Sequence, residues 1–261
     1  MSHAAIYLEA KKLTVVEQTN TLLKDVSFAA RAGELHVILG PNGAGKSTLI
    51  RAMAGLQSAS AGTVLCAGCP IGKLSVSERA VQLAVLLQQQ WLDFPFSVQE
   101  VVTMGGYPVS HSILDTEASV NTLDYALETF DLLALRYQDY TRLSGGEQQR
   151  VHLARLLMQV SSQTRALVLD EPLKAIDLSH QYVVMKQLKR MASQGLAVVV
   201  VLHDLSLAAR FADCITLLKQ GSVIRTGTTQ SVMQSPLLSD VFDAEIRKSK
   251  DAEAPLFYVA G

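Results

Sequence analysis

Eight residues, "GPNGAGKS" from Gly40 to Ser47, constrain this 261-residue chain more strongly than any other feature. They fit the pattern G-x-x-x-x-G-K-S, follow a short apolar strand, "GELHVILG", and run into a helical stretch, "STLIRAMAGL". Glycines let the backbone curl so that its N–H groups surround phosphate oxygens, and the dipole of the following helix adds partial positive charge. The spacing does not fit the dinucleotide-binding pattern G-x-G-x-x-G. The segment therefore predicts a phosphate-binding loop rather than an ordinary glycine-rich turn.

The side chains of this loop indicate a nucleoside triphosphate that binds together with a metal ion. Lys46 can reach the β- and γ-phosphates, and the hydroxyl of Ser47 can ligate Mg²⁺. The predicted cofactor-binding residues of the loop are Gly40, Pro41, Asn42, Gly43, Ala44, Gly45, Lys46, Ser47 and Thr48.

A second apolar strand ends in two carboxylates, in the segment "ALVLDEP". Asp170, at the end of the strand, suits a metal site, and Glu171 can orient or deprotonate an attacking water. His203 follows another apolar strand, in "VVVVLHDLS", and is expected at the same carboxyl edge of a parallel sheet. An Asp-Glu pair after a strand is common by chance, and a lone histidine there could merely cap a helix. Their order after a phosphate loop favours a catalytic role.

The segment "LSGGEQQRVHLARLL", from Leu143 to Leu157, predicts a second anion-binding helix start. Ser144 and Glu147 form an S-x-x-E capping box, so a helix is expected to begin directly after the serine. Two glycines, a hydroxyl and free backbone N–H groups there are suited to an anion. A chain that already has a phosphate loop must use this second site for something else.

The order of apolar patterns predicts an α/β fold. Two alternating stretches, "IYLEAKKLTVV" and "LLKDVSFAA", suit antiparallel strands, and "LKQGSVIRTG" suits a hairpin around Gly221. Residues 98–158 read as mostly helical, and after them strands alternate with helices, which is typical of a parallel sheet covered on both faces. One domain, residues 1–261, is expected, with a core of about 1–90 and 163–261 and an inserted helical subdomain of about 91–162.

Composition excludes several classes of protein. With 23 basic and 24 acidic residues the net charge is −1, so there is no electrostatic footprint for nucleic acid. Apolar stretches such as 196–202 are far shorter than the roughly 20 residues that span a bilayer, and "MSHAAIYLEAKK" lacks a signal-peptide pattern. We expect a cytosolic chain with some apolar surface for partners.

Three cysteines are too few for a disulfide framework. Cys66 and Cys69 form C-x-x-C, but a zinc or redox site would need a second pair, a histidine partner or a thioredoxin-like setting. We interpret "SAGTVLCAGCPIG" as a strand and a turn.

Taken together, these motifs resemble the ATP-binding subunits of ABC transporters over nearly the whole chain. The resemblance rests on "GPNGAGKST", "LLQQQ", "LSGGEQQR", "LVLDEP", "AID" and "VLHD", which occur in the order typical of that family. It implies a P-loop NTPase core with N-terminal antiparallel strands and an inserted helical subdomain. It also implies an ATPase that uses ATP and Mg²⁺ and works as a homodimer with two membrane-spanning permease subunits. A periplasmic or extracellular substrate-binding protein would deliver the cargo, and this chain would sit on the cytoplasmic face of the inner membrane.

The resemblance assigns a role to the second anion site. Two chains pack head to tail, and Ser144, Gly145, Gly146 and Glu147 of one chain close over the ATP of the other. Gln88 falls at the glutamine that joins core and helical subdomain and senses Mg²⁺ and the water. Asp177, in "AID", lies in a loop at the dimer interface, and His203 holds the γ-phosphate and the water. The implied catalytic residues are Glu171, His203 and Gln88, and the implied metal ligands are Ser47, Gln88 and Asp170.

This sequence departs from the family pattern at two places. Leu173 and Lys174 replace two small hydroxyl residues, so the communication between the two ATP sites is in question, although Lys174 could equally be a solvated lysine without a role. Glu17 stands where many members carry an aromatic residue that stacks on adenine.

Three classes of protein share some of these motifs. A soluble ABC ATPase acting on DNA or ribosomes would usually have paired cassettes or long coiled-coil insertions, and a small P-loop kinase or GTPase would not need "LSGGE". An importer subunit fits best, because exporters often fuse the cassette to the membrane spans.

The region "LLQQQWLDFPFSVQEVVTMGGYP" resembles the branch that imports iron-siderophores, haem and cobalamin. "FPFSVQEVV", "EPLKAIDLSHQ", "HDLSLAARFAD" and the ending "APLFYVAG" most resemble haem (haemin) importers, with ferric siderophore as the second expectation and cobalamin as the third. Phe94 and Phe96 would either present aromatic surface to a permease or pack the helical subdomain's own core.

Overall fold

The computed structural model describes residues 4–88, 92–110, 122–249 and 256–259. Gln89, Gln90 and Trp91 of "LLQQQW", residues 111–121 of the expected helical stretch, and parts of both chain ends lie outside the described residues. Within the described ranges, none of the helices combines the length and apolarity that crossing a bilayer requires.

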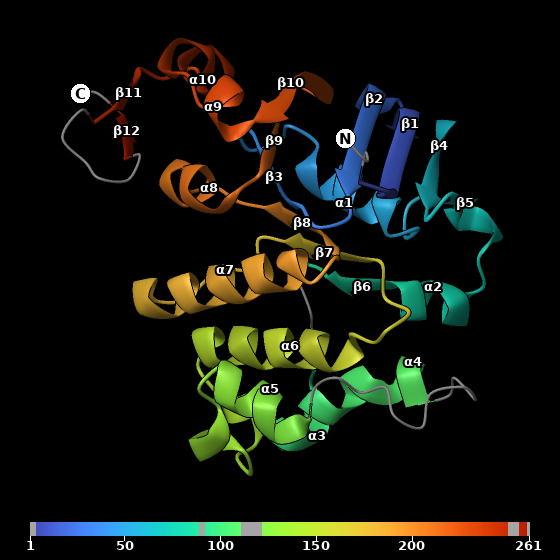
Figure 1. The fold of residues 1–261 in the computed structure, drawn as a ribbon, viewed down its shortest axis with the longest axis vertical. Helices are drawn as coiled ribbons and strands as arrows, with labels where there is room; N and C mark the ends of the chain where they lie inside the picture. The colour runs from blue at the N-terminus through green and yellow to red at the C-terminus, as the bar shows by residue number, and fades with distance from the viewer. Residues whose placement is uncertain (1–3, 89–91, 111–121, 250–255, 260–261) are drawn as a thin grey trace.

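A six-stranded sheet forms the centre of the molecule (Figure 1). Its strands in spatial order are β10 (Ser222–Thr228), β9 (Cys214–Lys219), β3 (Leu35–Leu39), β8 (Ala197–Val201), β7 (Ala166–Asp170) and β6 (Leu83–Leu86). All neighbours pair in parallel except β10, which forms an antiparallel hairpin with β9. The expected parallel sheet and the hairpin around Gly221 are confirmed, whereas β6 was not anticipated.

The inner strands are buried on both faces, which is why they read as continuous apolar runs. In β8, Val198 and Val200 belong to one core and Val199 and Val201 to the other. The first core lies under α7 (Leu178–Ser193) and α8 (Leu205–Phe211), and the second lies under α1 (Lys46–Met53). The sheet is therefore covered on both sides, and its carboxyl edge is left for the loops that follow β3, β7 and β8.

A second, antiparallel sheet covers α1 from outside, and it confirms the expected N-terminal strands. Its spatial order is β2 (Asn20–Arg31), β1 (Ile6–Glu17), β4 (Ala61–Cys66) and β5 (Cys69–Pro70). Leu49 and Met53 of α1 pack in one core with Leu13 of β1. The "SAGTVLCAGCPIG" segment is a strand and turn as expected, with Cys66 opposite Cys69 in the β4–β5 pair.

The remaining elements are mostly helical. They are α2 (Val76–Gln82), α3 (Val98–Thr103), α4 (Tyr107–Ser110), α5 (Leu123–Thr129), α6 (Gly145–Gln159), α9 (Thr229–Val232) and α10 (Ser235–Phe242), the short strands β11 (Ile246–Lys248) and β12 (Phe257–Val259), and the 3₁₀ turns Ile71–Lys73, Met104–Gly106, Leu133–Leu135 and Tyr140–Arg142. Helices α3, α5 and α6 form a group below the sheet in Figure 1, with α7 between this group and the strands. The numerical division of the domain at about 91 and 162 stays a prediction.

Candidate functional site

The predicted phosphate loop connects β3 to α1 as a tight turn. Gly43 and Gly45 have φ values of 76° and 97°, in the left-handed region that glycine tolerates best. A side chain on Gly45 would also meet the Leu22 carbonyl oxygen at 2.9 Å. The ammonium group of Lys46 donates hydrogen bonds to the carbonyl oxygens of Gly40 at 2.8 Å and Pro41 at 2.9 Å, so it lies within the curl of the loop. Burial lowers the pKa of Lys46, and the carboxylates of Glu171 and Asp170 oppose that shift.

A cavity of about 520 Å³ opens over this loop, and residues from distant parts of the chain line it. Gln88 and Glu171 contribute to its wall, as do Thr21, Leu22, Gln220 and Gly221. The last four were not among the predicted site residues. The Gly221 N–H donates to the Ala44 carbonyl at 3.0 Å, which fixes the β9–β10 turn against the phosphate loop. The sequence indicated this turn, but it gave no signal for where the turn would pack.

Asp170 lies at the carboxyl end of β7, beside the hydroxyl of Ser47. It is only 1% exposed, and burial raises the pKa of its carboxyl group, while a hydrogen bond from Ser47 and the charges of Arg51 and Lys46 act in the opposite direction. Its Oδ1 atom is buried and has no hydrogen-bond partner among the described residues. A buried carboxylate oxygen of this kind, next to a hydroxyl, fits a hard cation such as Mg²⁺.

Glu171 brings the three predicted catalytic residues together. Its Oε2 accepts a hydrogen bond from the side-chain amide of Gln88 at 2.7 Å, and its Oε1 pairs with Nε2 of His203 at 2.6 Å. The backbone of Glu171 has a φ of 50°, which is strained for a residue with a side chain. Carboxylate, imidazole and amide thus meet at the edge of the phosphate-loop cavity, an arrangement able to orient and deprotonate a water.

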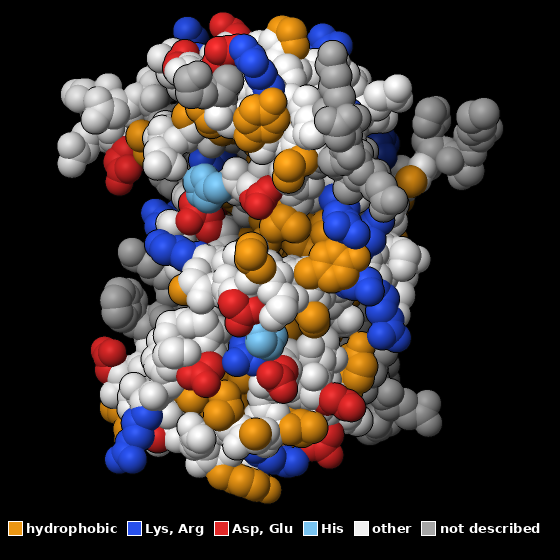
Figure 2. Space-filling view, turned by 90° about the vertical axis from the view of Figure 1, so that its left-hand side faces the viewer, with side chains coloured by type: hydrophobic (Ala, Val, Ile, Leu, Met, Phe, Trp, Pro, Cys, Tyr) orange, Lys and Arg blue, Asp and Glu red, His pale blue; other side chains and the backbone are white. Residues whose placement is uncertain are grey.

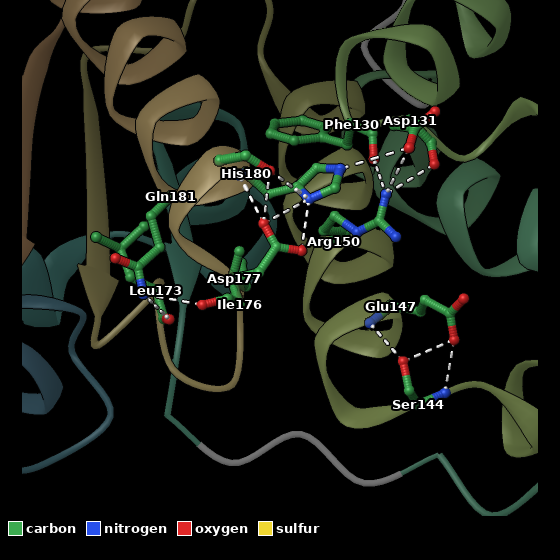
Figure 3. Close-up of polar contacts among 11 residues, drawn as sticks. Phe130, Asp131, Ser144, Glu147, Arg150, Leu173, Ile176, Asp177, His180 and Gln181 are labelled. Carbon is green, nitrogen blue, oxygen red and sulfur yellow. Dashed lines mark hydrogen bonds and ion pairs between the residues drawn. The ribbon is translucent and has the colours of Figure 1, made fainter.

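The second predicted anion site has its own cavity of about 530 Å³, which shares no lining residue with the first. Its lining residues are Ser144, Gly145, Gly146, Glu147, Arg150, Ala175, Ile176 and Asp177. Helix α6 begins at Gly145, as expected from the capping box, and Figure 3 shows the reciprocal bonds. The Ser144 N–H donates to the Glu147 carboxylate at 2.8 Å, and the Glu147 N–H donates to the Ser144 hydroxyl at 3.3 Å. Hydrogen bonds from the Ser144 hydroxyl, at 2.7 Å, and from the Ser144 N–H lower the pKa of the Glu147 carboxyl group.

Asp177 belongs to this second site and not to the phosphate loop. It is the N-cap of α7, and its carboxylate accepts the His180 N–H at 3.0 Å and the Ser179 hydroxyl at 2.7 Å. These hydrogen bonds hold the pKa of Asp177 far below its usual value. Gly146 touches the same loop, because a Cβ atom there would lie 2.6 Å from the Ala175 carbonyl oxygen.

The residues that depart from the family pattern have distinct surroundings. Leu173 is buried, whereas Lys174 is exposed and lines a third cavity together with Glu171 and His203. Glu17 is exposed at the end of β1 and does not line the phosphate-loop cavity.

Phe94 and Phe96 differ in their surroundings, and each fits one of the two expectations. Phe96 packs against the main hydrophobic core, while Phe94 is 67% exposed and touches Phe96 with ring centroids 6.1 Å apart. One aromatic therefore serves the core, and the other remains on the surface.

Cys214 has neighbours that the sequence did not suggest. Its thiol lies with Glu34 and His36 in a cluster whose possible ligand atoms are within 4.8 Å of one another. Burial raises the pKa of Cys214 to about 12 and that of the Glu34 carboxyl group as well. A protonated thiol beside a carboxyl group explains the cluster without a metal, and we assign it no function.

Comparison with known proteins gives consistent matches. A model of the ABC transporter family matches residues 23–174. The Hemin import ATP-binding protein HmuV of Shewanella denitrificans is 42% identical over 240 residues, covering 90% of this chain and 93% of that protein. The protein of the same name from Pseudomonas fluorescens is 42% identical over 241 residues, covering 92% and 93%.

Solved structures agree on the fold. An ATP-binding subunit of an ABC transporter superimposes with a TM-score of 0.78 at 23% identity, covering 90% of this chain and 97% of the other. A bacterial ABC transporter cassette solved as a dimer gives a TM-score of 0.72 at 27% identity, covering 85% and 98%. An inward-facing ABC transporter gives 0.76 at 25% identity, covering 98% of both chains.

Proposed function

Because this chain belongs to the ABC transporter family, we propose that it is the ATP-hydrolysing subunit of an importer whose cargo is haem (hemin). The assignment of haem as the cargo rests on the 39–42% identity to hemin import ATP-binding proteins from several bacteria, over 90% or more of this chain. The ATPase itself does not need to contact the cargo. What it supplies is the free energy of ATP hydrolysis, delivered to a membrane partner.

The geometry of the phosphate-loop cavity supports ATP as the nucleotide. Residues 40–48 would bind its phosphates through backbone N–H groups and Lys46. Ser47, Asp170 and Gln88 would hold Mg²⁺, and the unpartnered Oδ1 of Asp170 supports that assignment. Held there, Mg²⁺ would neutralise charge on the phosphates. Glu171 then accepts the proton of the attacking water, while His203 and Gln88 fix the carboxylate in place.

The second site supports a homodimer as the working unit. We call the cavity at the second anion site, lined by Ser144 to Glu147, the LSGGE cavity. Among the described residues of one chain, it has no lining residue in common with the phosphate-loop cavity. A head-to-tail partner would place Ser144, Gly145, Gly146, Glu147 and Asp177 over the other chain's ATP, so that each ATP is enclosed by both chains. We further propose that the homodimer binds two permease subunits, and that a substrate-binding protein acts on the permease without contacting this chain. The chain would lie peripherally on the cytoplasmic face of the inner membrane.

Surface chemistry is compatible with protein partners rather than nucleic acid. Figure 2 shows one face, on which hydrophobic side chains are interspersed with acidic and basic ones. The net charge of −1 agrees with this.

The test is growth of a strain that lacks this chain, with haem as the sole iron source. We expect growth to fail and to return with the wild-type chain but not with Glu171→Gln. Parallel cultures on ferric siderophore and on cobalamin-dependent medium identify the cargo. Unimpaired haem use with lost siderophore or cobalamin uptake would overturn haem and leave the ATPase assignment intact.

A further inference from the structure

A short loop connects the two candidate sites within one chain. It comprises residues 171–177, between the end of β7 and the start of α7, and we call it the connecting loop. Glu171, at its first position, lines the phosphate-loop cavity, and Asp177, at its last, lines the LSGGE cavity. The backbone of this loop thus joins the two cavities directly.

The connecting loop is fastened to both neighbouring helices by side-chain amides. Gln149 of α6 donates to the Pro172 carbonyl at 3.0 Å, and Gln181 of α7 donates to the Ile176 carbonyl at 2.9 Å. Its position is thus determined by how α6 and α7 lie relative to each other.

His180 adds a contact of a different kind, because its ring lies between two carboxylates (Figure 3). Nδ1 lies 2.9 Å and 2.8 Å from the two carboxylate oxygens of Asp177, and Nε2 lies 3.4 Å from Oδ2 of Asp131. Asp131 follows α5, so the half-buried ring joins the end of the connecting loop to the helical group.

Arg150 ties the same aspartate to the LSGGE helix. Its guanidinium donates to the Phe130 and Asp131 carbonyl oxygens, both at 2.8 Å, and lies 3.5 Å from Oδ2 of Asp131. Arg150 belongs to α6, whose first turn forms the second anion site. A continuous polar chain therefore runs from α6 through Asp131 and His180 to Asp177.

The protonation state of the ring matters for this chain of contacts. A neutral imidazole has one N–H and one lone pair, whereas the imidazolium has two N–H donors. Since carboxylates face both nitrogens, only the protonated ring can donate to both. The other polar groups around it are the Ser179 hydroxyl, 3.5 Å from Nδ1, and the Arg150 guanidinium beyond Asp131.

We propose that His180 is a positioning residue that clamps the connecting loop to the helical group, and so couples closure of the LSGGE site to the placement of Glu171. This rests on the proposed ATPase function and dimer. His180 touches neither cavity's expected ligand and acts through Asp177. With both ring nitrogens donating, the clamp is complete, and without His180 the loop keeps its Gln149 link to α6 but loses the link through Asp131.

The experiment uses the full transporter, chain plus permease, and compares wild type with His180→Ala, Asp131→Asn and the double variant. We expect His180→Ala to lower kcat for ATP roughly 2- to 30-fold, the range of mutations in coupling networks, with KM for ATP little changed. The two single losses should not add in the double variant, because either one breaks the same bridge. Lys186→Ala, an exposed position on the same helix, is the matched control and should behave as wild type.

Each result decides the matter. Equal kcat in wild type and His180→Ala, or additive losses in the double variant, would overturn the clamp. A purely structural role predicts a lowered unfolding temperature and a raised KM for ATP alongside the lowered kcat. If His180→Ala does not fold, Asp131→Asn carries the test, since Arg150 keeps its main-chain partners there. A wild-type transporter without ATPase activity would instead refute the proposed function.

Discussion

Glu171 combines strain, hydrogen bonding and position in a way that points to a specialised role. Its φ of 50° costs on the order of 1–3 kcal/mol for a residue with a side chain, and the surrounding structure must maintain it. The bonds from Gln88 and His203 hold its carboxylate at the cavity edge. Such strain is most common at functional sites.

We predict that Glu171→Gln binds ATP but hydrolyses it about 10²- to 10⁴-fold more slowly, because the amide keeps the shape and loses the base. ATP should then hold two chains in a stable dimer, detectable by size-exclusion chromatography. Glu245→Gln, at an exposed position near the C-terminus, is the control and should turn over ATP normally. Near-normal hydrolysis by Glu171→Gln would remove this residue from the proposed role.

The sequence predicted the catalytic and metal-binding residues of the site better than it predicted the other residues that line the cavity. Lys46, Asp170, Glu171 and His203 were identifiable because each follows a strand or opens a helix in a recognisable order. Thr21 and Gln220 line the same cavity, yet no local pattern marks them. Their positions depend on how two sheets pack, which is a property of the tertiary structure.

At the scale of the elements, the start of α6 carries a sharp local requirement, which two adjacent glycines illustrate. A Cβ on Gly146 would lie 2.6 Å from the Ala175 carbonyl oxygen, whereas a Cβ on Gly145 would meet only the Ala175 side chain at 3.8 Å. The first contact is a clash with backbone, and the second is an ordinary van der Waals contact. Helix α6 can approach the connecting loop this closely only with glycine at position 146.

We therefore predict that Gly146→Ala lowers the free energy of unfolding by about 1–3 kcal/mol, the usual cost of overpacking. The matched variant Gly145→Ala should be neutral or slightly stabilising, because alanine is the better helix former. Urea unfolding of both single chains measures the difference. Equal stability of the two variants would show that the connecting loop moves aside without cost.

Element boundaries were predictable where a cap or a turn specifies them. The start of α6 follows from the reciprocal hydrogen bonds of Ser144 and Glu147. Strands β7 and β9 begin and end with the apolar stretches "ALVLD" and "CITLLK" of the sequence. Strand β6 was missed because four residues, "LAVL", give too short a pattern to separate strand from helix. Helix α2 was missed although Ser75 and Glu78 form a capping box like that of α6, a signal the sequence did contain.

For the molecule as a whole, two buried histidines connect stability to pH. His36 in β3 pairs with the Thr216 hydroxyl at 2.8 Å, and His152 in α6 pairs with the Tyr140 hydroxyl at 2.8 Å. Burial lowers the pKa of each from 6.5 to about 4. One lies between the two sheets and the other in the helical group, so both parts of the fold contribute.

The direction of the effect follows from proton counting. Between pH 6.5 and about 4 the unfolded chain binds a proton at each of these histidines and the folded chain does not. The free energy of unfolding therefore falls as pH decreases through this window and is unaffected by these groups above it. Each histidine contributes a slope of at most about 1.4 kcal/mol per pH unit.

We predict that wild type loses stability steeply between pH 7 and pH 4.5, and that His36→Gln removes about half of the loss due to these two groups. Glutamine keeps an amide for Thr216 and does not titrate, so the variant should be relatively more resistant to acid even if it is less stable at pH 7. His152→Gln should remove the other half, and the two effects should add because the sites share no partner. Urea unfolding at closely spaced pH values gives the slopes. Parallel curves for wild type and both variants would contradict this prediction. They would mean that other groups cause the acid sensitivity, and that these imidazoles become accessible to solvent before the chain unfolds.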